Sequence, residues 1–290
     1  MSPATHSMSN SDPARFLLPA GYLRVLDPSA ATRLGHIRHV LFDFDGTISV
    51  LRQGWEEVMH PLMVEMICDG GPPTSQIEKE VAEYIDISTG IVTIEQMQWL
   101  AEAVRRYGLN QHPLGAAEYK AIYVRRLLVR VEERLERLAS GQVTSDDMMI
   151  AGARDFVTGL AALGMQLYLA SGTDHEYVAA EAEALGIANC FGGEIYGAVD
   201  DDESHRKEKI IQRILDEHGL RGDELLVVGD GPVEMREAVA RQALALGVAS
   251  DEVVRSGWNS AKVGRLTLAG AHFLVPDLGR ARELLAFLFW

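Results

Sequence analysis

Two aspartates, Asp43 and Asp45, stand one residue apart at the end of an apolar run that begins at Val40. Gly46 follows and turns the chain, and Thr47 adds a hydroxyl group. Two carboxylates this close repel one another and lose hydration unless a cation or a proton lies between them. The spacing favours a site for a cation or for proton transfer. The alternative is an ordinary strand end followed by an Asp-Gly turn.

Further polar side chains take similar places later in the chain, and each also has an ordinary explanation. Ser171 follows an apolar run, and a serine there commonly caps the next helix. Asp230 ends another apolar run, with Glu234 four residues beyond it. Lys207 begins a helical pattern inside a charged stretch, which is typical of a solvated helix start. Lys209 in the same stretch is the other candidate for a functional lysine. We expect these residues to matter only if the fold brings them together.

Apolar runs that predict buried strands alternate with helical patterns through most of the chain. Such alternation predicts a parallel sheet with right-handed crossovers. The carboxyl ends of parallel strands share one edge of the sheet, so residues distant in sequence meet there. The predicted strands are 40–44, 165–170, 191–196, 225–230, 243–248 and 271–275, and the predicted helices between and after them are 154–163, 174–185, 207–218 and 278–288. Asp174 is expected to cap the second of these helices.

Between the first and second predicted strands, the pattern is helical throughout. From Trp55 to about Ala139, apolar residues recur at spacings of three and four, which is typical of amphipathic helices. Breaks at 70–73 and 112–113 contain Gly-Pro and His-Pro sequences that end helices. The segment predicts four helices without a strand, which together would form a helical lid over the strand ends.

Composition narrows the possible functions. The chain has 290 residues, a hydrophobic content of 47% and a formal net charge of −15. This acidic balance argues against binding to nucleic acid, whose phosphates require a basic surface. Its two cysteines, Cys68 and Cys190, are too few for a disulfide framework, and no apolar run is long enough for a membrane span. We expect a cytoplasmic protein without nucleic-acid or membrane partners.

Taken in order, four segments resemble the motifs of the haloacid dehalogenase (HAD) superfamily. They are Asp43-Phe44-Asp45-Gly46-Thr47, Ser171 after a strand, Lys207 before a helix, and 229–234 with Asp230 and Glu234. The resemblance implies an α/β fold with a Rossmann-like parallel sheet core and an inserted all-helical cap domain of the C1 type. The implied division is an N-terminal extension at 1–36, a core at 37–50 and 145–290, and a cap at 51–144.

The resemblance also implies catalytic roles. Asp43 matches the nucleophile that accepts a phosphoryl group, and Asp45 matches the general acid and base. Ser171 would donate a hydrogen bond to a phosphoryl oxygen. Lys207 would neutralise another phosphoryl oxygen and keep Asp43 ionised. It is preferred over Lys209 because the apolar pattern after it fits the family.

A Mg²⁺ site is implied by the same motifs. Its ligands would be a carboxylate oxygen of Asp43, the backbone carbonyl of Asp45 and the carboxylate of Asp230, all hard oxygen donors. Glu234 would bind the metal directly or through water. Many family members carry an aspartate where Glu234 stands, and the longer side chain of Glu234 keeps the negative charge.

Substrate contacts are expected around the same strand ends. Thr47 would orient the nucleophile loop, and Ser171 and Gly172 would present donors to the phosphate together with Lys207. Arg52, in the segment that leads into the helices, offers a further phosphate or sugar contact.

The acid at Asp45 indicates the reaction, because an alkoxide leaving group needs a proton. HAD members that resemble dehalogenases lack an acid there. The sequence therefore predicts a Mg²⁺-dependent phosphomonoesterase acting on a small phosphorylated metabolite, such as a sugar phosphate or a phosphoglycolate-like compound. The alternatives are a phosphomutase of the β-phosphoglucomutase type and, third, a non-catalytic binding protein. Monomer and homodimer both remain open.

Overall fold

The structure is a computed structural model that describes residues 18–199 and 202–289. Its centre is a seven-stranded sheet in the order β1-β7-β6-β5-β2-β3-β4. Strands β2 to β7 pair in parallel, and β1 joins the edge antiparallel to β7. The strands are β1 (Arg24–Val25), β2 (His39–Asp43), β3 (Gln166–Asp174), β4 (Ile195–Ala198), β5 (Leu225–Gly229), β6 (Leu244–Val248) and β7 (Phe273–Val275).

The predicted α/β class with a parallel sheet core is confirmed, and two local strand predictions were wrong. Strands β2 to β7 are parallel, and β1, from the predicted N-terminal extension, adds an antiparallel edge strand that was not predicted. Residues 1–17 of that extension lie outside the described residues. Strand β3 continues past Ala170 through Ser171 to Asp174, with an irregularity in its pairing to β4. Strand β4 begins later than predicted, because Phe191 closes a short 3₁₀ turn instead.

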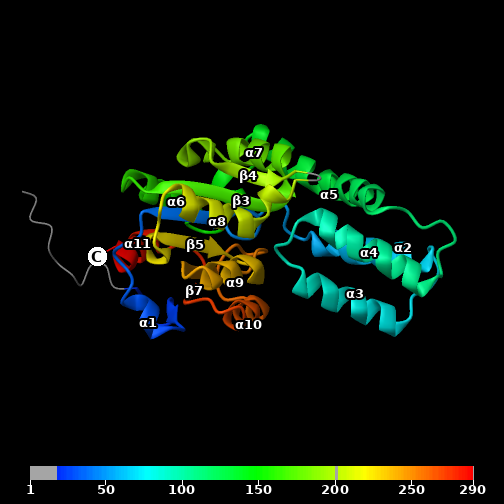
Figure 1. The fold of residues 1–290 in the computed structure, drawn as a ribbon. Helices are drawn as coiled ribbons and strands as arrows, with labels where there is room; N and C mark the ends of the chain where they lie inside the picture. The colour runs from blue at the N-terminus through cyan, green and yellow to red at the C-terminus, as the bar shows by residue number, and fades with distance from the viewer. Residues whose placement is uncertain (1–17, 200–201, 290) are drawn as a thin grey trace, which may run out of the picture.

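Helices cover both faces of the sheet (Figure 1). The first face packs on α6 (Ala153–Ala162), α7 (His175–Ala184) and α11 (Ala281–Phe289), and the second on α8 (Lys207–Glu217), α9 (Pro232–Ala240) and α10 (Ser260–Leu268). The sequence predicted α6, α7, α8 and α11, whereas α9 and α10 were not predicted. Short pieces complete the core: α1 (Pro28–Ala31) and the 3₁₀ turns Ser145–Met148, Ala188–Phe191, Glu203–His205 and Gly222–Glu224.

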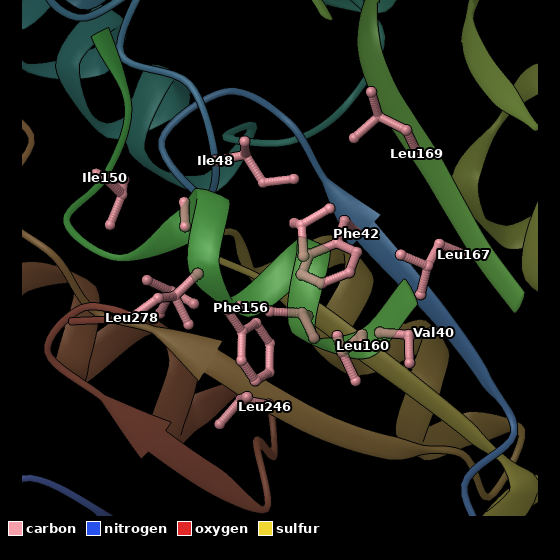
Figure 2. Close-up of a cluster of buried hydrophobic side chains, with 14 of the residues drawn as sticks. Val40, Phe42, Ile48, Ile150, Phe156, Leu160, Leu167, Leu169, Leu246 and Leu278 are labelled. Atoms are coloured by element: carbon pink, nitrogen blue, oxygen red, sulfur yellow. The ribbon is translucent and has the colours of Figure 1, made fainter. Parts of the chain in front are cut away.

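The largest apolar cluster lies between the sheet and α6. Phe42 of β2 is fully buried and meets Phe156 of α6 edge to face, with ring centroids 6.0 Å apart. Figure 2 shows these two rings together with Leu160 of α6 and Leu246 of β6. Every second residue of β2 contributes to this cluster, while Leu41 points to the opposite face. Burial on both faces explains why β2 is an almost continuous apolar run.

Four helices follow β2 and pack mainly on one another. They are α2 (Glu56–Cys68), α3 (Ser75–Ile87), α4 (Thr93–Tyr107) and α5 (Ala116–Ala139). Their apolar stripes form a separate buried cluster that includes Met59, Leu100 and Tyr119. They lie beside the sheet and its covering helices, at the right of Figure 1. Arg134 of α5 donates a hydrogen bond to the carbonyl of Leu51 at 2.7 Å, which ties these helices to the segment that leaves the sheet. The predicted domain boundaries stay a prediction.

Strand β2 lies at the point of the sheet where successive strands begin to be added on the opposite side. The chain continues from β2 to β3 on one side, whereas β5 pairs with β2 on the other side. Crevices at the carboxyl ends of strands beside such a switch point are where open α/β sheets bind ligands. Asp43 ends β2, and Asp230 directly follows β5. In the described part of the chain, no helix combines the length and apolar character needed to cross a bilayer.

Truncating Phe156 to alanine is expected to destabilise the protein by about 3–5 kcal/mol, because it removes a buried ring and leaves a cavity. Urea unfolding measures this loss. The change Leu163→Ala, at a side chain that is 39% exposed just after the same helix, serves as the control and should cost far less. Equal losses in the two variants would contradict the assignment of the main core to the α6 face.

Candidate active site

A cavity lies where the carboxyl ends of β2, β3 and β5 meet the inserted helices. Both the sheet and the insertion supply its walls. The walls include Asp43, Asp45, Ser171, Gly172, Lys207 and Asp230 from the core, and Thr93, Gln96, Tyr123 and Leu127 from the insertion. The predicted acidic, hydroxyl and cationic groups therefore converge on one space. Thr47 and Glu234 lie just behind its surface, where they touch the lining residues.

Asp43 is buried at the end of β2 and carries two side-chain contacts. The Lys207 ammonium donates to its Oδ1 at 2.6 Å, and the Thr47 hydroxyl donates to its Oδ2 at 3.1 Å. Burial raises the pKa of Asp43 well above its ordinary value, and the neighbouring carboxylates of Glu234 and Asp230 add to this, while Lys207 opposes it. The ionised form of Asp43 thus depends on positive charge nearby. Thr47 is fully buried, so its hydroxyl serves to orient Asp43.

Lys207 is the first residue of α8 and is buried, whereas the competing Lys209 is exposed. Its Nζ also donates to Oε2 of Glu234 at 3.1 Å. The other oxygen of Glu234 accepts the backbone N–H of Gly231 at 2.8 Å, which caps the start of α9. Glu234 therefore has a clear local task, which is to fix Lys207 against Asp43 and to anchor the turn after β5.

Asp45 uses its two carboxylate oxygens differently. Its Oδ2 accepts hydrogen bonds from the Ser171 hydroxyl at 2.9 Å and from the Thr173 hydroxyl at 3.1 Å. Its Oδ1 is buried and has no hydrogen-bond partner among the described residues. The nearest cation to Oδ1 is Arg52, whose Nε lies 3.9 Å away. One oxygen of Asp45 is thus held in place, and the other is left for a group that enters the cavity.

Arg52 is buried and bound to a carboxylate that the sequence did not single out. Its guanidinium donates to Glu181 of α7 through Nη2 at 2.6 Å and through Nε at 3.1 Å. Burial raises the pKa of Glu181 to about 7, although the adjacent Arg52 opposes this rise. Arg52 lines the cavity as predicted, but Glu181 already compensates its charge.

The carboxylates fit a Mg²⁺ ion. Ligand oxygens of Asp43, Asp230 and Glu234 all lie within 4.8 Å of one another, and all three side chains are buried. Hard carboxylate oxygens are the donors that Mg²⁺ prefers. Gly46 keeps this space open: its φ is +76°, and a Cβ there would come within 2.4 Å of Asp230 Oδ2. These residues match the predicted metal set except for the Asp45 carbonyl, whose role stays a prediction.

A second buried lysine completes the cluster. Lys262 of α10 places its Nζ 2.6 Å from Asp230 Oδ2 and 2.7 Å from Glu252 Oε1. The sequence analysis missed Lys262 and Glu252, as well as Glu181. Their segments carry no motif, and each is recognisable only through the partner that the fold supplies.

Ion pairs join the inserted helices to the core at and near the rim of the cavity, where Asp174 and Arg265 line it. The pairs are Lys120 with Asp174 at 2.6 Å, Arg206 with Glu95 at 2.8 Å, and Arg265 with Asp86 at 2.8 Å. The expected capping role of Asp174 was wrong, because its side chain makes no cap hydrogen bond to α7 and binds Lys120 instead.

Gly172 lies where the backbone of the insertion packs directly against the core. A Cβ at this position would lie 2.5 Å from the backbone carbonyl of Ile91, which belongs to the loop between α3 and α4. The absence of a side chain lets that loop reach the strand end beside Ser171. Gly172 is therefore a place where the insertion and the core fit together directly.

The fold and the site together define an α/β protein with a buried carboxylate cluster beside a helical insertion. Residues 37–240 match the family model described as haloacid dehalogenase-like hydrolase, so the chain belongs to that family. The predicted family and the prediction of an enzyme are both confirmed.

Solved structures share the fold at low sequence identity. A predicted phosphatase from Clostridium acetobutylicum is 15% identical, with a TM-score of 0.57 over 86% of this chain and 98% of that one. A predicted phosphoglycolate phosphatase from Haemophilus somnus is 14% identical, with the same TM-score and the same coverage. CbbY from Rhodobacter sphaeroides, in complex with xylulose-(1,5)bisphosphate, is 19% identical, with a TM-score of 0.53 over 88% and 100%. No curated protein sequence matches the chain.

The change Gly172→Ala is expected to lower hydrolytic activity at least tenfold and also to lower thermal stability, because the methyl group would meet a backbone carbonyl. The added methyl group would displace the Ile91 carbonyl and open the contact between insertion and core. Activity and thermal unfolding should be measured side by side. Gly264→Ala, at a glycine of α10 with open space around its Cβ position and no positive φ, is the control for adding a methyl group. Unchanged activity in Gly172→Ala would show that this contact does not shape the site.

Proposed function

We propose that the chain is a Mg²⁺-dependent phosphomonoesterase that hydrolyses a small phosphorylated metabolite through an aspartyl-phosphate on Asp43. The unpartnered Oδ1 of Asp45 carries this proposal. A buried carboxylate oxygen without a hydrogen-bond partner is costly unless a substrate or water meets it. Its place in the cavity beside Asp43 suits a group that gives a proton to a leaving alkoxide and later takes one from water.

In the first step, a carboxylate oxygen of Asp43 forms a bond to phosphorus while the ester P–O bond breaks. Asp45, protonated on Oδ1, gives its proton to the departing oxygen and becomes a carboxylate. Ser171 and Thr173 hold Oδ2 throughout, so Oδ1 keeps its direction toward the cavity. The leaving alcohol then departs neutral.

In the second step, water attacks phosphorus and Asp45 takes the proton that the water loses. The bond between Asp43 and phosphorus breaks, which releases inorganic phosphate and regenerates both carboxyl groups. Phosphoryl transfer relies mainly on positioning and charge, because negative charge spreads over the equatorial oxygens. Lys207 supplies positive charge at Asp43, and Glu234 fixes its direction. Bound Mg²⁺, held by Asp43 and Asp230 with Glu234 nearby, would stabilise the same charge.

A phosphomutase remains the alternative, and it requires the cavity to hold a second phosphate. Arg52 is committed to the buried Glu181. Arg265 pairs with Asp86, which is 56% exposed, and its Nε is buried without a partner among the described residues. Arg265 is therefore the cavity cation that would have to bind the second phosphate if the chain were a mutase.

We predict that Asp43→Asn abolishes release of phosphate from a metabolite panel, because the amide is not a nucleophile here. Asp45→Asn should slow the reaction about 100- to 10,000-fold, the usual contribution of a positioned acid and base. Glu102→Gln, at an exposed position of α4, is the control for losing one carboxylate. Normal activity in Asp45→Asn would refute its assignment, and no Mg²⁺-dependent turnover of any ester would refute the proposed function.

Hydrolysis and mutase activity are separated by their products. A monoesterase releases inorganic phosphate without a bisphosphate primer, and Arg265→Gln should then change its kcat/KM less than threefold for substrates with one phosphate. A mutase would form an isomer, require the primer, and lose this activity in Arg265→Gln. Product analysis by phosphorus NMR distinguishes the two results.

A further inference from the structure

The second buried lysine is not needed by the steps proposed above. Lys262 reaches the carboxylate cluster from α10 and is 4% exposed. Its two contacts, at 2.6 Å and 2.7 Å, are to Asp230 Oδ2 and Glu252 Oε1. Unlike Lys207, Lys262 forms no ion pair with Asp43 in the described part of the chain, and its charge acts on Asp230 and Glu252 instead.

The two oxygens of Asp230 are divided between different neighbours. Oδ2 binds Lys262, while Oδ1 lies 3.4 Å from the Thr47 hydroxyl, which itself donates to Asp43. Oδ1 therefore faces the group of residues that fits a metal. Gly46 leaves room for this division, because a Cβ there would overlap Asp230 Oδ2 and approach Glu252 Oε1 within 2.9 Å.

The balance of buried charges in this cluster suits a single divalent cation. Four carboxylates face two ammonium groups, and with all six ionised the cluster keeps two uncompensated negative charges. The members are Asp43, Asp230, Glu234 and Glu252 with Lys207 and Lys262. Without Lys262, the same buried space would carry one more negative charge, and a buried group of like charges is costly until a cation binds it.

We propose that Lys262 is a positioning residue for the metal ion: it holds one oxygen of Asp230 and weakens divalent-cation binding at the other. Glu252 moderates this effect, because it shares the ammonium of Lys262. The inference rests on the Mg²⁺ site of the proposed function. It adds that Lys262 of α10, which forms no ion pair with the nucleophile Asp43 in the described part of the chain, adjusts the affinity of the site for the ion.

Mg²⁺ binding to the full chain, measured by isothermal titration calorimetry, tests the proposal. Lys262→Met should tighten the Kd for Mg²⁺ at least tenfold, and thermal unfolding should begin lower without Mg²⁺ but show a larger rise with it. Glu252→Gln should weaken the Kd at least threefold, because Lys262 then acts on Asp230 alone. Lys262→Arg keeps the charge and should stay within threefold of the unmodified chain.

Lys79→Met removes an exposed lysine of α3 and is the matched control. An unchanged or weaker Kd in Lys262→Met overturns the proposal and leaves Lys262 a purely structural residue. If Lys262→Met does not fold, Glu252→Gln decides, and an equal or tighter Kd there overturns it. Absence of Mg²⁺ binding in the unmodified chain overturns both this proposal and the metal requirement. Mg²⁺ binding without ester hydrolysis overturns only the proposed function.

Discussion

The contact between Asp43 and Lys207 is the constraint on which the rest of the site depends. A carboxylate buried at the end of a central strand must be matched by positive charge, since an uncompensated buried ion costs several kcal/mol. The lysine comes from the start of α8, 164 residues later in the chain. Its own direction depends on Glu234, which in turn caps α9 after β5. The ends of β2, α8 and α9 are therefore locked together by one chain of charged hydrogen bonds.

The same requirement organises the other ionised groups. Asp230 is matched by Lys262, and Arg52 is matched by Glu181, so most of the buried charges have a partner of opposite sign. Asp45 differs, because one of its oxygens is satisfied by hydroxyl groups and the other is not satisfied. A structure that compensates its buried charges and leaves one carboxylate oxygen open marks the place where a reacting group belongs.

Much of this arrangement could be predicted from the sequence, and the failures have physical reasons. Apolar runs identified β2 and β5 because both faces of a central parallel strand are buried. The end of β3 was misplaced, since Ser171 to Asp174 is a polar stretch that reads as a turn and is held as strand by β4 and the insertion. Propensity and pattern describe the chain locally, and tertiary contacts override them at such points.

Residues that act through a distant partner were the ones that escaped prediction. Lys207 could be identified because the helix that it begins has a strong apolar face and an ordered place among the motifs. Lys262 begins no motif. The feature that distinguishes it from a surface lysine is its pairing with two carboxylates, Glu252 and Asp230, which lie ten and 32 residues earlier in the chain. Spacing along a sequence does not record such a pairing, whereas burial in the folded chain does.

The ion pairs near the rim of the cavity differ in solvent exposure from those at its floor. Lys207, Asp43 and Glu234 are at most 6% exposed, so water does not screen their interactions. The Arg265–Asp86 pair between core and insertion includes a carboxylate that is 56% exposed, and pairs of that kind contribute only about 0–1 kcal/mol. The Lys120–Asp174 pair, whose side chains are 7% and 23% exposed, is better shielded from water than this one. The insertion is therefore joined to the core by ion pairs of unequal burial, whereas the charged groups at the floor of the cavity are uniformly buried.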